Sequence, residues 1–378
     1  MANPTISHFK IDGDSIISDP VAASPFIPGS SNVFPKFADA IKETGWELWF
    51  VDGVSAEEKA AITIGLSRNG EDRTHNGFKA QITAIWPDES TWYRDLYFPE
   101  SIATIDGEDG DISGVWQDTT TNASISFLVS ADCSLVKLEL AVPGVVEGSM
   151  HLVAQSGDSG HDSDPALGPL VNYVRPIGRA SVTAEMVFHE QDTADGRKLT
   201  LGVQGQGARG GMDHVWSAYT WSQIMTESYY LRAQVGPYAI QIMRIFSTLE
   251  SGNNVYTVAR LYDGGKLICA AQKAVDLAEE ECVQDSLVLR KVYDDANHSG
   301  RTGAFRDHNK GYIVRFIKAG TGEHWEFQVH HDRIFWNIPT SAPGPNATGN
   351  TGFIEHLVGG HGDEAFCGVG TGGQCELS

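Results

Sequence analysis

Residues 258–271 read VARLYDGGKLICAA. The two runs that flank the tight turn Asp263-Gly264-Gly265 have the period-two pattern of β-strands. An Asp-Gly pair between two such runs is a strong signal of a β-hairpin. The same alternation recurs in WELWFVDG (46–53), LVKLELAV (135–142), GYIVRFIKAG (311–320) and HWEFQVHH (324–331). Only residues 55–61 and 276–284 could form short helices, and both are equally compatible with acidic loops. The pattern predicts an all-β protein.

The chain has 378 residues, which is long for a single hydrophobic core. A weakly hydrophobic, glycine-rich segment, GVQGQGARGGMD at 202–213, separates two strand-rich halves. We therefore predict two domains, 1–208 and 209–378, each a sandwich or a barrel. Ligand space would then lie inside a barrel or at the domain interface.

The net charge is −22, with 49 acidic and 27 basic residues spread along the chain. This charge argues against nucleic acid or an anionic membrane surface as a partner. No apolar run has the length of a membrane span or of a signal peptide, so we expect no membrane span and a cytoplasmic location. The final CELS has the length of a prenylation box at Cys375, but Glu376 stands where an aliphatic residue belongs and no basic cluster precedes it.

The five cysteines are odd in number and form no C-x-x-C pair, which disfavours a disulfide framework or a zinc site. His330 and His331 are adjacent, so on a strand they point to opposite faces and cannot jointly bind one metal ion. The G-x-G-x-x-G strings that start at Gly205 and Gly368 lack the acidic residue or the helix of a dinucleotide site, and we interpret both as turns or linker. No metal and no cofactor are expected.

Two hydrolase patterns also fail. Ser159 lies in GDSGH at 157–161, but His161 is too close in sequence to act as its base, and no motif surrounds the other candidate histidines. We interpret this segment as an exposed loop. A glycoside hydrolase needs two carboxylates that face each other, whereas Glu47 and Asp52 have opposite parity on one strand. The other carboxylates considered are Asp88, Glu227 and Asp307.

The segment 216–246 interleaves aromatic and polar residues. Alternation predicts that one strand face carries Tyr230, Arg232 and Gln234, and that the other carries the apolar residues from Tyr229 to Val235. The polar face is either a solvated outer face, which composition favours, or a barrel lumen that holds an amphipathic ligand.

Six strings, in order along the chain, carry a resemblance to a known family. They are SNVFPKF (31–37), WELWFVDG (46–53), AIWPDESTW (84–92), YYLRAQVGPYAIQIMRIF (229–246), ARLYDGG (259–265) and WNIPTSAPGPNATGNTGFIE (336–355). The chain resembles the fungal decalin synthases, the lipocalin-like intramolecular Diels–Alderases of equisetin- and phomasetin-type polyketide–tetramic acid biosynthesis. The resemblance implies an N-terminal β-sandwich, a C-terminal lipocalin-like β-barrel and a substrate pocket between them.

The resemblance also implies a reaction and a substrate. The reaction is a stereoselective Diels–Alder (4+2) cyclisation of a linear polyenoyl tetramic acid, made by a polyketide synthase–nonribosomal peptide synthetase, to a decalin. Such a step needs no nucleophile or cofactor, because the enzyme contributes mainly by holding a flexible polyene in a reactive conformation. A selectivity of roughly 100:1 requires only about 2.7 kcal/mol of differential binding. A non-catalytic lipocalin-like carrier of a hydrophobic metabolite is the alternative.

The resemblance carries over to particular positions. The catalytic candidates are Asn350, Asp52 and Thr83. The candidate substrate-binding residues are Phe50, Gln81, Tyr173, Trp221, Tyr230 and Trp336. Where relatives can have glutamate, asparagine and lysine, this chain has Phe50, Thr83 and Asn350, so a cationic anchor for the tetramate is in doubt, and Arg232 and Arg244 are the candidates to replace it.

Overall fold

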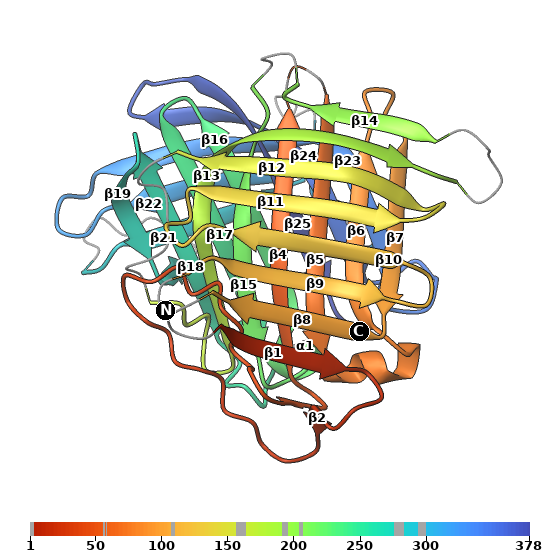
Figure 1. Cartoon of the computed structure of the whole chain (residues 1–378). Helices are drawn as coiled ribbons and strands as arrows, with labels where there is room; N and C mark the ends of the chain where they lie inside the picture. The colour runs from red at the N-terminus through yellow and green to blue at the C-terminus, as the bar shows by residue number, and fades with distance from the viewer. Residues whose placement is uncertain are drawn as a thin grey trace. The chain divides into compact units, whose positions relative to one another are not determined.

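The structure, a computed structural model, describes residues 4–55, 57, 59–106, 110–155, 164–190, 196–203, 207–275, 283–293 and 300–378. The chain divides into two compact units, which are described separately: unit 1 is Met1–Pro165 with Val171–Thr220, and unit 2 is Ala166–Leu170 with Trp221–Ser378. In both units the described residues are mainly in strands (Figure 1). The all-β prediction is therefore confirmed.

Unit 1 contains a short 3-10 helix, η1 (Gly70–His75), and fifteen strands among its described residues. The strands are β1 (Thr5–Lys10), β2 (Ile16–Ile17), β3 (Ile41–Lys42), β4 (Trp46–Ser55), β5 (Ala60–Asn69), β6 (Phe78–Ile85), β7 (Thr91–Phe98), β8 (Glu100–Ile105), β9 (Ile112–Asp118), β10 (Ala123–Val129), β11 (Leu135–Val142), β12 (Val146–Ala154), β13 (Val171–Phe188), β14 (Arg197–Leu201) and β15 (Arg209–Ser217). β4 and β5 pair as an antiparallel hairpin from Ser55 and Ala60 onward, so the described residues of 55–61 form no helix.

Thirteen of these strands form one sheet, in the order β1-β8-β9-β10-β11-β12-β13-β15-β4-β5-β6-β7, with β14 paired to β13. The sheet folds over on itself, and Figure 1 shows β8 to β12 crossing β4 to β7. Side chains from the two layers meet in a shared core: the rings of Trp49 and Trp116 lie 5.6 Å apart, edge to face, and those of Trp86 and Phe188 lie 5.4 Å apart. This is the expected β-sandwich.

The described residues of unit 2 form a one-turn helix, α1 (Trp221–Ile224), and ten strands that pair in one sheet. The strands are β16 (Met225–Val235), β17 (Tyr238–Ser247), β18 (Val255–Asp263), β19 (Lys266–Ala271), β20 (Lys273–Val275), β21 (Ser286–Val292), β22 (Gly311–Ile317), β23 (His324–Pro339), β24 (Gly349–His361) and β25 (Phe366–Glu376). The order is β19-β18-β17-β16-β25-β24-β23-β22-β21-β20. The second helical candidate, 276–284, lies almost entirely outside the described residues.

The sheet of unit 2 curls into a nearly closed barrel. Its two ends approach each other where the backbone N–H of Ala270 donates to the Asp285 carboxylate at 2.9 Å. The interior is filled by apolar side chains such as Leu231, Ile240 and Phe327. The hairpin at 258–271 forms as predicted, and its turn residues Gly264 and Gly265 have φ angles of 53° and 90°, the positive values that this tight turn requires. The lipocalin-like barrel is confirmed.

The glycine-rich segment behaves differently from the linker expected there. From Arg209 onward it is strand β15, which pairs with β13 and β4 inside unit 1, and the long second segment of unit 2 begins only at Trp221. Gly210 is required for this pairing, because a Cβ atom there would lie 1.9 Å from the carbonyl oxygen of Asp52. The glycine is a sign of tight strand packing, which composition alone does not distinguish from a linker.

Candidate functional site

Five of the predicted site residues lie on one face of unit 1. On β4, Trp49 and Val51 point into the sandwich core, so Phe50 and Asp52 point away from it. By the same alternation Gln81 and Thr83 of β6 point outward, and Tyr173 of β13 reaches Asp213, the neighbour of Phe50. We call this side of the β13-β15-β4-β5-β6-β7 layer the outer face of unit 1.

An arginine joins two carboxylates on this face. Arg175 donates to Asp52 at 2.9 Å and to Asp213 at 2.7 Å, and all three side chains are almost fully buried. The N–H of Gly211 adds a bond to Asp52 at 3.0 Å, and the Tyr173 hydroxyl donates to Asp213 at 3.3 Å. A Cβ at Gly211 would lie 2.4 Å from the Arg175 guanidinium, so the glycine makes room for it. Asp52 is thus a fixed ion-pair partner.

A second polar group on the outer face centres on Gln81. Its amide donates to the hydroxyl of Tyr93 at 2.5 Å and to the carboxylate of Asp95 at 3.2 Å, while Tyr93 donates to Asp95 at 3.0 Å. Burial and the nearby Asp95 raise the pKa of the Tyr93 phenol, which therefore stays a hydrogen-bond donor. Thr83 pairs with Tyr93 across the ladder and is buried.

Sequence reasoning missed four polar residues of this face: Arg175, Asp213, Tyr93 and Asp95. A signal existed for the last two, since they alternate along TWYRDLYF (91–98) within a predicted strand. Asp213 was hidden because it lies in the segment interpreted as a linker.

In unit 2, Tyr230, Trp336 and Asn350 form one cluster. The Tyr230 and Trp336 rings stack with centroids 6.4 Å apart and planes 15° apart, and the Trp336 indole N–H donates to the Asn350 side-chain oxygen at 3.1 Å. Two glycines make the stacking possible, because they occupy the ladder positions between the two rings, on β25 and β24. A Cβ at Gly373 would lie 2.5 Å from the Tyr230 ring, and one at Gly352 would lie 2.4 Å from the Trp336 ring. We call this cluster the aromatic wall.

The remaining predicted residue of unit 2, Trp221, lies at the first position of α1 and is half-buried. The structure thus places it on a helical turn, whereas Tyr230, Trp336 and Asn350 lie on strands.

The two faces of β16 correct both interpretations of its polar residues. The apolar face, from Tyr229 to Val235, fills the barrel interior, so the polar face does not line a lumen. The polar face points outward, yet Arg232 is only 6% exposed, so it is not a solvated face either. Its guanidinium carbon lies 4.8 Å from the centre of the Tyr230 ring. Arg244 instead points into the barrel, where it donates to the carbonyl of Leu289 at 3.2 Å, so it cannot join this face.

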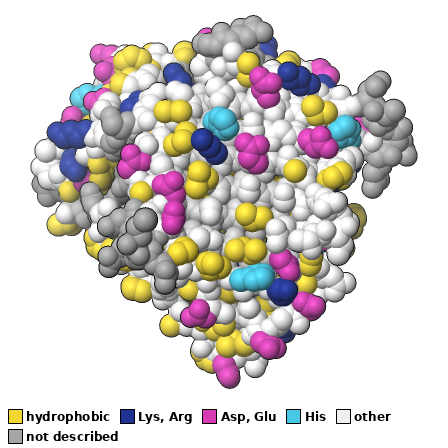
Figure 2. All heavy atoms as spheres, viewed as in Figure 1, with side chains coloured by type: hydrophobic (Ala, Val, Ile, Leu, Met, Phe, Trp, Pro, Cys, Tyr) yellow, Lys and Arg dark blue, Asp and Glu magenta, His cyan; other side chains and the backbone are white. Residues whose placement is uncertain are grey.

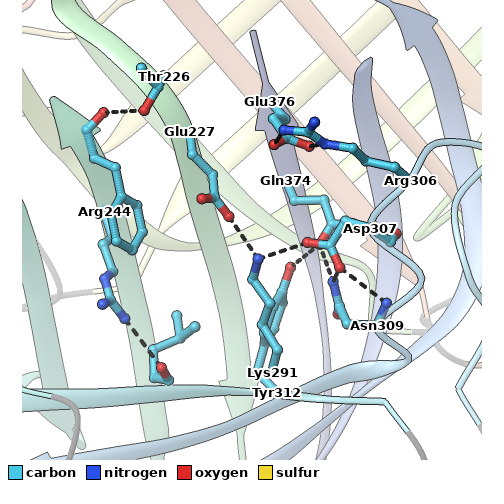
Figure 3. Close-up of polar contacts among 12 residues, drawn as sticks. Thr226, Glu227, Arg244, Lys291, Arg306, Asp307, Asn309, Tyr312, Gln374 and Glu376 are labelled. Atoms are coloured by element: carbon cyan, nitrogen blue, oxygen red, sulfur yellow. Dashed lines mark hydrogen bonds and ion pairs between the residues drawn. The ribbon is translucent and has the colours of Figure 1, made fainter. Parts of the chain in front are cut away.

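The interior of the barrel holds a polar network of its own (Figure 3). Lys291 donates to Glu227 at 2.7 Å and to Asp307 at 2.8 Å, which leaves neither glycosidase candidate available as a catalytic carboxylate. Asn309 donates to Asp307 at 3.1 Å and to Gln374. The cavity beside Glu227 and Gln374 has a volume of about 10 Å³. It has room for no more than a water molecule, so this network is structural.

The rejected motifs have mixed outcomes. Ser159 and Gly205 lie outside the described residues. The string that begins at Gly368 lies in β25, so the turn or linker expected there is wrong. A Cβ at Gly370 would lie 2.6 Å from that of Ala233 on the paired strand, which explains a glycine-rich strand. Glu47 and Asp52 face opposite sides of β4, as predicted: Glu47 accepts from His214 at 2.9 Å on the core side.

The surface and the helices add three observations. Asp and Glu side chains are spread over the face seen in Figure 2, without one dominant patch. Neither helix in the described part of the chain has the length and hydropathy that crossing a membrane requires. Within the described ranges, no three His, Cys, Asp or Glu side chains come together as metal ligands.

Comparison with known proteins identifies the family. The Diels-Alderase-like family matches residues 1–378. The chain belongs to this family. The Diels-Alderase of Gibberella fujikuroi is 54% identical over 379 residues, and Diels-Alderase fsa2 of Fusarium heterosporum is 52% identical over 382 residues, with 100% of each chain covered in both cases. The crystal structure of CghA superposes with a TM-score of 0.92 at 34% identity and covers 99% of both chains.

Membership in the Diels-Alderase-like family confirms the resemblance to fungal decalin synthases. The chain is therefore an enzyme, a pericyclase that catalyses an isomerase-type cyclisation. The alternative of a non-catalytic carrier is contradicted. The absence of a recognisable nucleophilic motif agrees with this chemistry, since a concerted cycloaddition transfers no proton to the protein.

Proposed function

We propose that this Diels–Alderase converts a linear polyenoyl tetramic acid into a decalin of defined stereochemistry. The observation that carries the proposal is the aromatic wall: two stacked rings, seated over Gly352 and Gly373, with the amide of Asn350 at one edge. A flat apolar wall suits a conjugated polyene, and an amide suits the carbonyl that activates the dienophile.

In this proposal the aromatic wall acts mainly by holding the polyene in one reactive conformation. Freezing each rotatable bond of the polyene is worth roughly 0.5 to 1.5 kcal/mol, and favouring one diastereomeric transition state by about 100:1 requires about 2.7 kcal/mol. A rigid surface provides this when it fits one folded polyene better than its competitors. The strands and glycines beneath Tyr230 and Trp336 hold both rings in place.

Asn350 has a defined orientation within the cluster. Its side-chain oxygen accepts the indole N–H of Trp336, so its NH2 group is the part that can donate to a substrate carbonyl. Such a donor stabilises the negative charge that develops on the dienophile carbonyl in the transition state. In this proposal Asn350 activates the substrate and Trp336 fixes the orientation of its amide.

The outer face of unit 1 completes the proposal. We propose that Thr83, Gln81 and Phe50 also contact the substrate, with Asp52 and Tyr173 held in place behind them by the Arg175 cluster. Trp221 is proposed as a further hydrophobic contact. Supply of the substrate by a polyketide synthase–nonribosomal peptide synthetase and a cytoplasmic location are parts of the same proposal.

The test is cyclisation of the purified linear polyenoyl tetramic acid. Wild-type protein should accelerate decalin formation and give one dominant diastereomer. Trp336→Ala should lower the rate roughly tenfold and reduce a 100:1 product ratio to between about 10:1 and 3:1, because losing about 1.4 to 2 kcal/mol of differential binding has that effect. Trp336→Phe is the matched control, which keeps a flat ring and should preserve the product ratio. No acceleration by the wild-type protein would refute the substrate assignment, and an unchanged ratio in Trp336→Ala would refute the wall.

A further inference from the structure

The strand that carries Trp336 is irregular where it reaches the aromatic wall. The register of β23 on β24 shifts twice, between His331 and Arg333 and again between Ile334 and Trp336. The second shift leaves Phe335 without a partner in this ladder, and its fully buried ring lies 5.2 Å from that of Trp336. Bulges of this kind are common beside active sites, where an extra residue changes the direction of a side chain. The position of Trp336 therefore depends on the register that β23 adopts after the second shift.

Backbone pairing alone specifies this register weakly. The strand opposite Trp336, β24, has Gly349 and Gly352 in this region, and β25 beyond it is glycine-rich as well. Glycine-rich strands are prone to slip, because they offer few side chains that pack in one register only. A slip of β23 by one residue would turn Trp336 to the opposite face of the sheet and separate its indole from Asn350. A side-chain contact that fixes the register would therefore hold the aromatic wall in place.

Asn337 supplies such a contact directly after the second shift. Its side-chain oxygen accepts a hydrogen bond from the hydroxyl of Thr351 at 3.0 Å and another from the backbone N–H of Ala304 at 3.2 Å. Asn337 and Thr351 are opposite each other in the ladder, next to the pair formed by Trp336 and Gly352. By alternation they lie on the other side of the sheet from Trp336, so this bond holds the register without being part of the wall.

The segment that contains Ala304 is attached to β23 on both sides of its irregular part. The backbone N–H of Arg301 donates to the carbonyl of His331 at 2.7 Å, ahead of the first shift, and Ala304 donates to Asn337 beyond the second. Asn337 is itself exposed, and neither of its two bonds involves the interior network around Lys291. Loss of the Asn337 side chain should therefore affect the register beside the wall and leave the interior network intact.

We infer that Asn337 is a positioning residue for the cyclisation. Its oxygen fixes the register of β23 beyond the irregular part, and this register places Trp336 over Gly352 and aligns its indole with the amide of Asn350. The residue acts through Trp336 and Asn350 and needs no contact with the substrate. The inference rests on the proposed function and deepens it, because it names the side chain that holds the aromatic wall in place.

The test compares two variants of Asn337 with a control on the same strand. Asn337→Leu has a side chain of similar size without a hydrogen-bond acceptor, whereas Asn337→Asp keeps an oxygen that accepts the same two hydrogens. The matched control is Glu326→Leu, ahead of both shifts, which removes the bond that the Arg315 guanidinium donates from β22 to β23 at 2.8 Å. Each protein is assayed with the linear polyenoyl tetramic acid for kcat, KM and the ratio of decalin diastereomers, and its Tm is measured.

A second measurement does not depend on the substrate. In protein with isotope-labelled tryptophan, the indole N–H signal of Trp336 is identified in NMR spectra by its loss in Trp336→Phe, and its chemical shift reports the hydrogen bond to Asn350. This signal should move in Asn337→Leu. It should keep its position in Asn337→Asp and in Glu326→Leu.

The inference predicts a loss of selectivity without a comparable loss of binding. Asn337→Leu should reduce a product ratio of about 100:1 to roughly 10:1 and lower kcat severalfold, with KM within about twofold of the wild-type value. The reason is that the apolar surface that binds the polyene remains, while its alignment in the transition state is lost. Asn337→Asp and Glu326→Leu should keep the wild-type ratio. Both leucine variants should show a similarly small fall in Tm, since each loses hydrogen bonds near the surface.

Three outcomes would overturn the inference and leave the proposed function intact. The first is a folded Asn337→Leu protein with the wild-type product ratio. The second is an equally lowered ratio in Asn337→Asp, which would mean that the acceptor oxygen is not the cause, and the third is an equal loss of selectivity in Glu326→Leu, which would indicate general destabilisation. Failure of the wild-type protein to accelerate cyclisation would instead refute the proposed function and any role of Asn337 in it, and the indole signal would still show whether Asn337 holds Trp336.

Discussion

A polar network inside the barrel and a buried amide outside it differ in how the fold satisfies their hydrogen bonds. Inside, Lys291, Asp307, Asn309 and His331 are linked by hydrogen bonds and ion pairs into one network. Outside, beside the aromatic wall, Gln241 is equally buried and has no hydrogen-bond partner in the described chain. A buried polar group that the fold satisfies stabilises the fold, whereas one that the fold leaves unsatisfied is available to a ligand. Changes inside should therefore alter stability, and changes outside should alter product formation.

The largest expected effect is at His331. Its ring stacks on Phe353 at 3.8 Å, one nitrogen faces the Glu355 carboxylate at 2.9 Å, and the other faces the Asn309 oxygen at 2.8 Å. The Asn309 nitrogen donates to Asp307 and Gln374, which leaves its side-chain oxygen facing His331. His331→Phe would leave the fully buried Glu355 carboxylate without this partner and should lower the free energy of unfolding by about 3 to 5 kcal/mol, measured by urea denaturation.

Two controls separate this pair from general damage. His330→Ala changes the adjacent residue, which points to the opposite face of β23, and should cost far less. The double variant His331→Phe/Glu355→Leu removes both partners of the buried pair and should recover much of the loss, because an apolar pair of similar volume can replace a buried polar pair. Folded His331→Phe protein should give the wild-type product ratio. A changed product ratio would contradict the expectation that substitutions inside the barrel affect stability and not product formation.

The second prediction concerns the outside. Gly352→Ala adds a Cβ that would lie 2.4 Å from the Trp336 ring, so the ring must move. Overpacking of this kind costs about 1 to 3 kcal/mol, and the displaced wall should also alter the ratio of decalin diastereomers, measured by chromatography. Gly344→Ala is the matched control, because no atom lies within 4 Å of the position of its added Cβ. Gly352→Ala protein with the wild-type ratio would show that the wall does not shape the product.

The sequence predicted the fold well because alternation directly reports strands. The hairpin at 258–271 required no long-range information. The residue pattern predicted a sandwich or a barrel for each half, and the resemblance to decalin synthases assigned the sandwich to the N-terminal part and the barrel to the C-terminal part. The candidate site was harder to predict from sequence, because pairing between strands that are distant in sequence brings its residues together. Nothing local to Gly352 or Gly373 shows that these glycines lie under Trp336 and Tyr230. Glycine was the most misleading residue, because Gly210, Gly368 and Gly370 were interpreted as linker or turn and instead allow close strand packing.

Gln241 shows a different limit of sequence reasoning. It lies among the interleaved polar residues of 216–246, but its burial and its missing hydrogen bonds are features that only a structure reports. Arg232 and Arg244 were equal candidates for a cationic anchor. The two side chains lie on different strands and point to opposite sides of the barrel wall. Arg232 lies beside Tyr230 on the outside, and Arg244 donates to the carbonyl of Leu289 inside the barrel.

The smallest expected effect is at Lys291. It tests how the stability contributed by the interior polar network depends on pH. Burial alone would raise the pKa of Asp307, but the hydrogen bond and charge of Lys291, together with the hydrogen bonds from Asn309, outweigh it, and the pKa is lowered from the usual 3.8. Burial alone would lower the pKa of Lys291, and its bonds to Asp307 and Glu227 raise it above 10.5. A lowered carboxylate pKa gives stability that is present above the unfolded value and lost as pH falls. A raised lysine pKa gives stability that is present below its unfolded value and lost as pH rises.

The stabilisation by Lys291 should therefore be greatest between pH 3.8 and pH 10.5. Near neutral pH, Lys291→Met should cost about 1 to 2 kcal/mol, between the values for exposed and buried pairs, since these side chains are partly exposed. The difference between wild type and variant, from denaturant midpoints at several pH values, should shrink as the solution is acidified below pH 3.8. A constant difference would mean that Lys291 stabilises the barrel by packing, and a changed product ratio at neutral pH would mean that the interior network reaches the reaction.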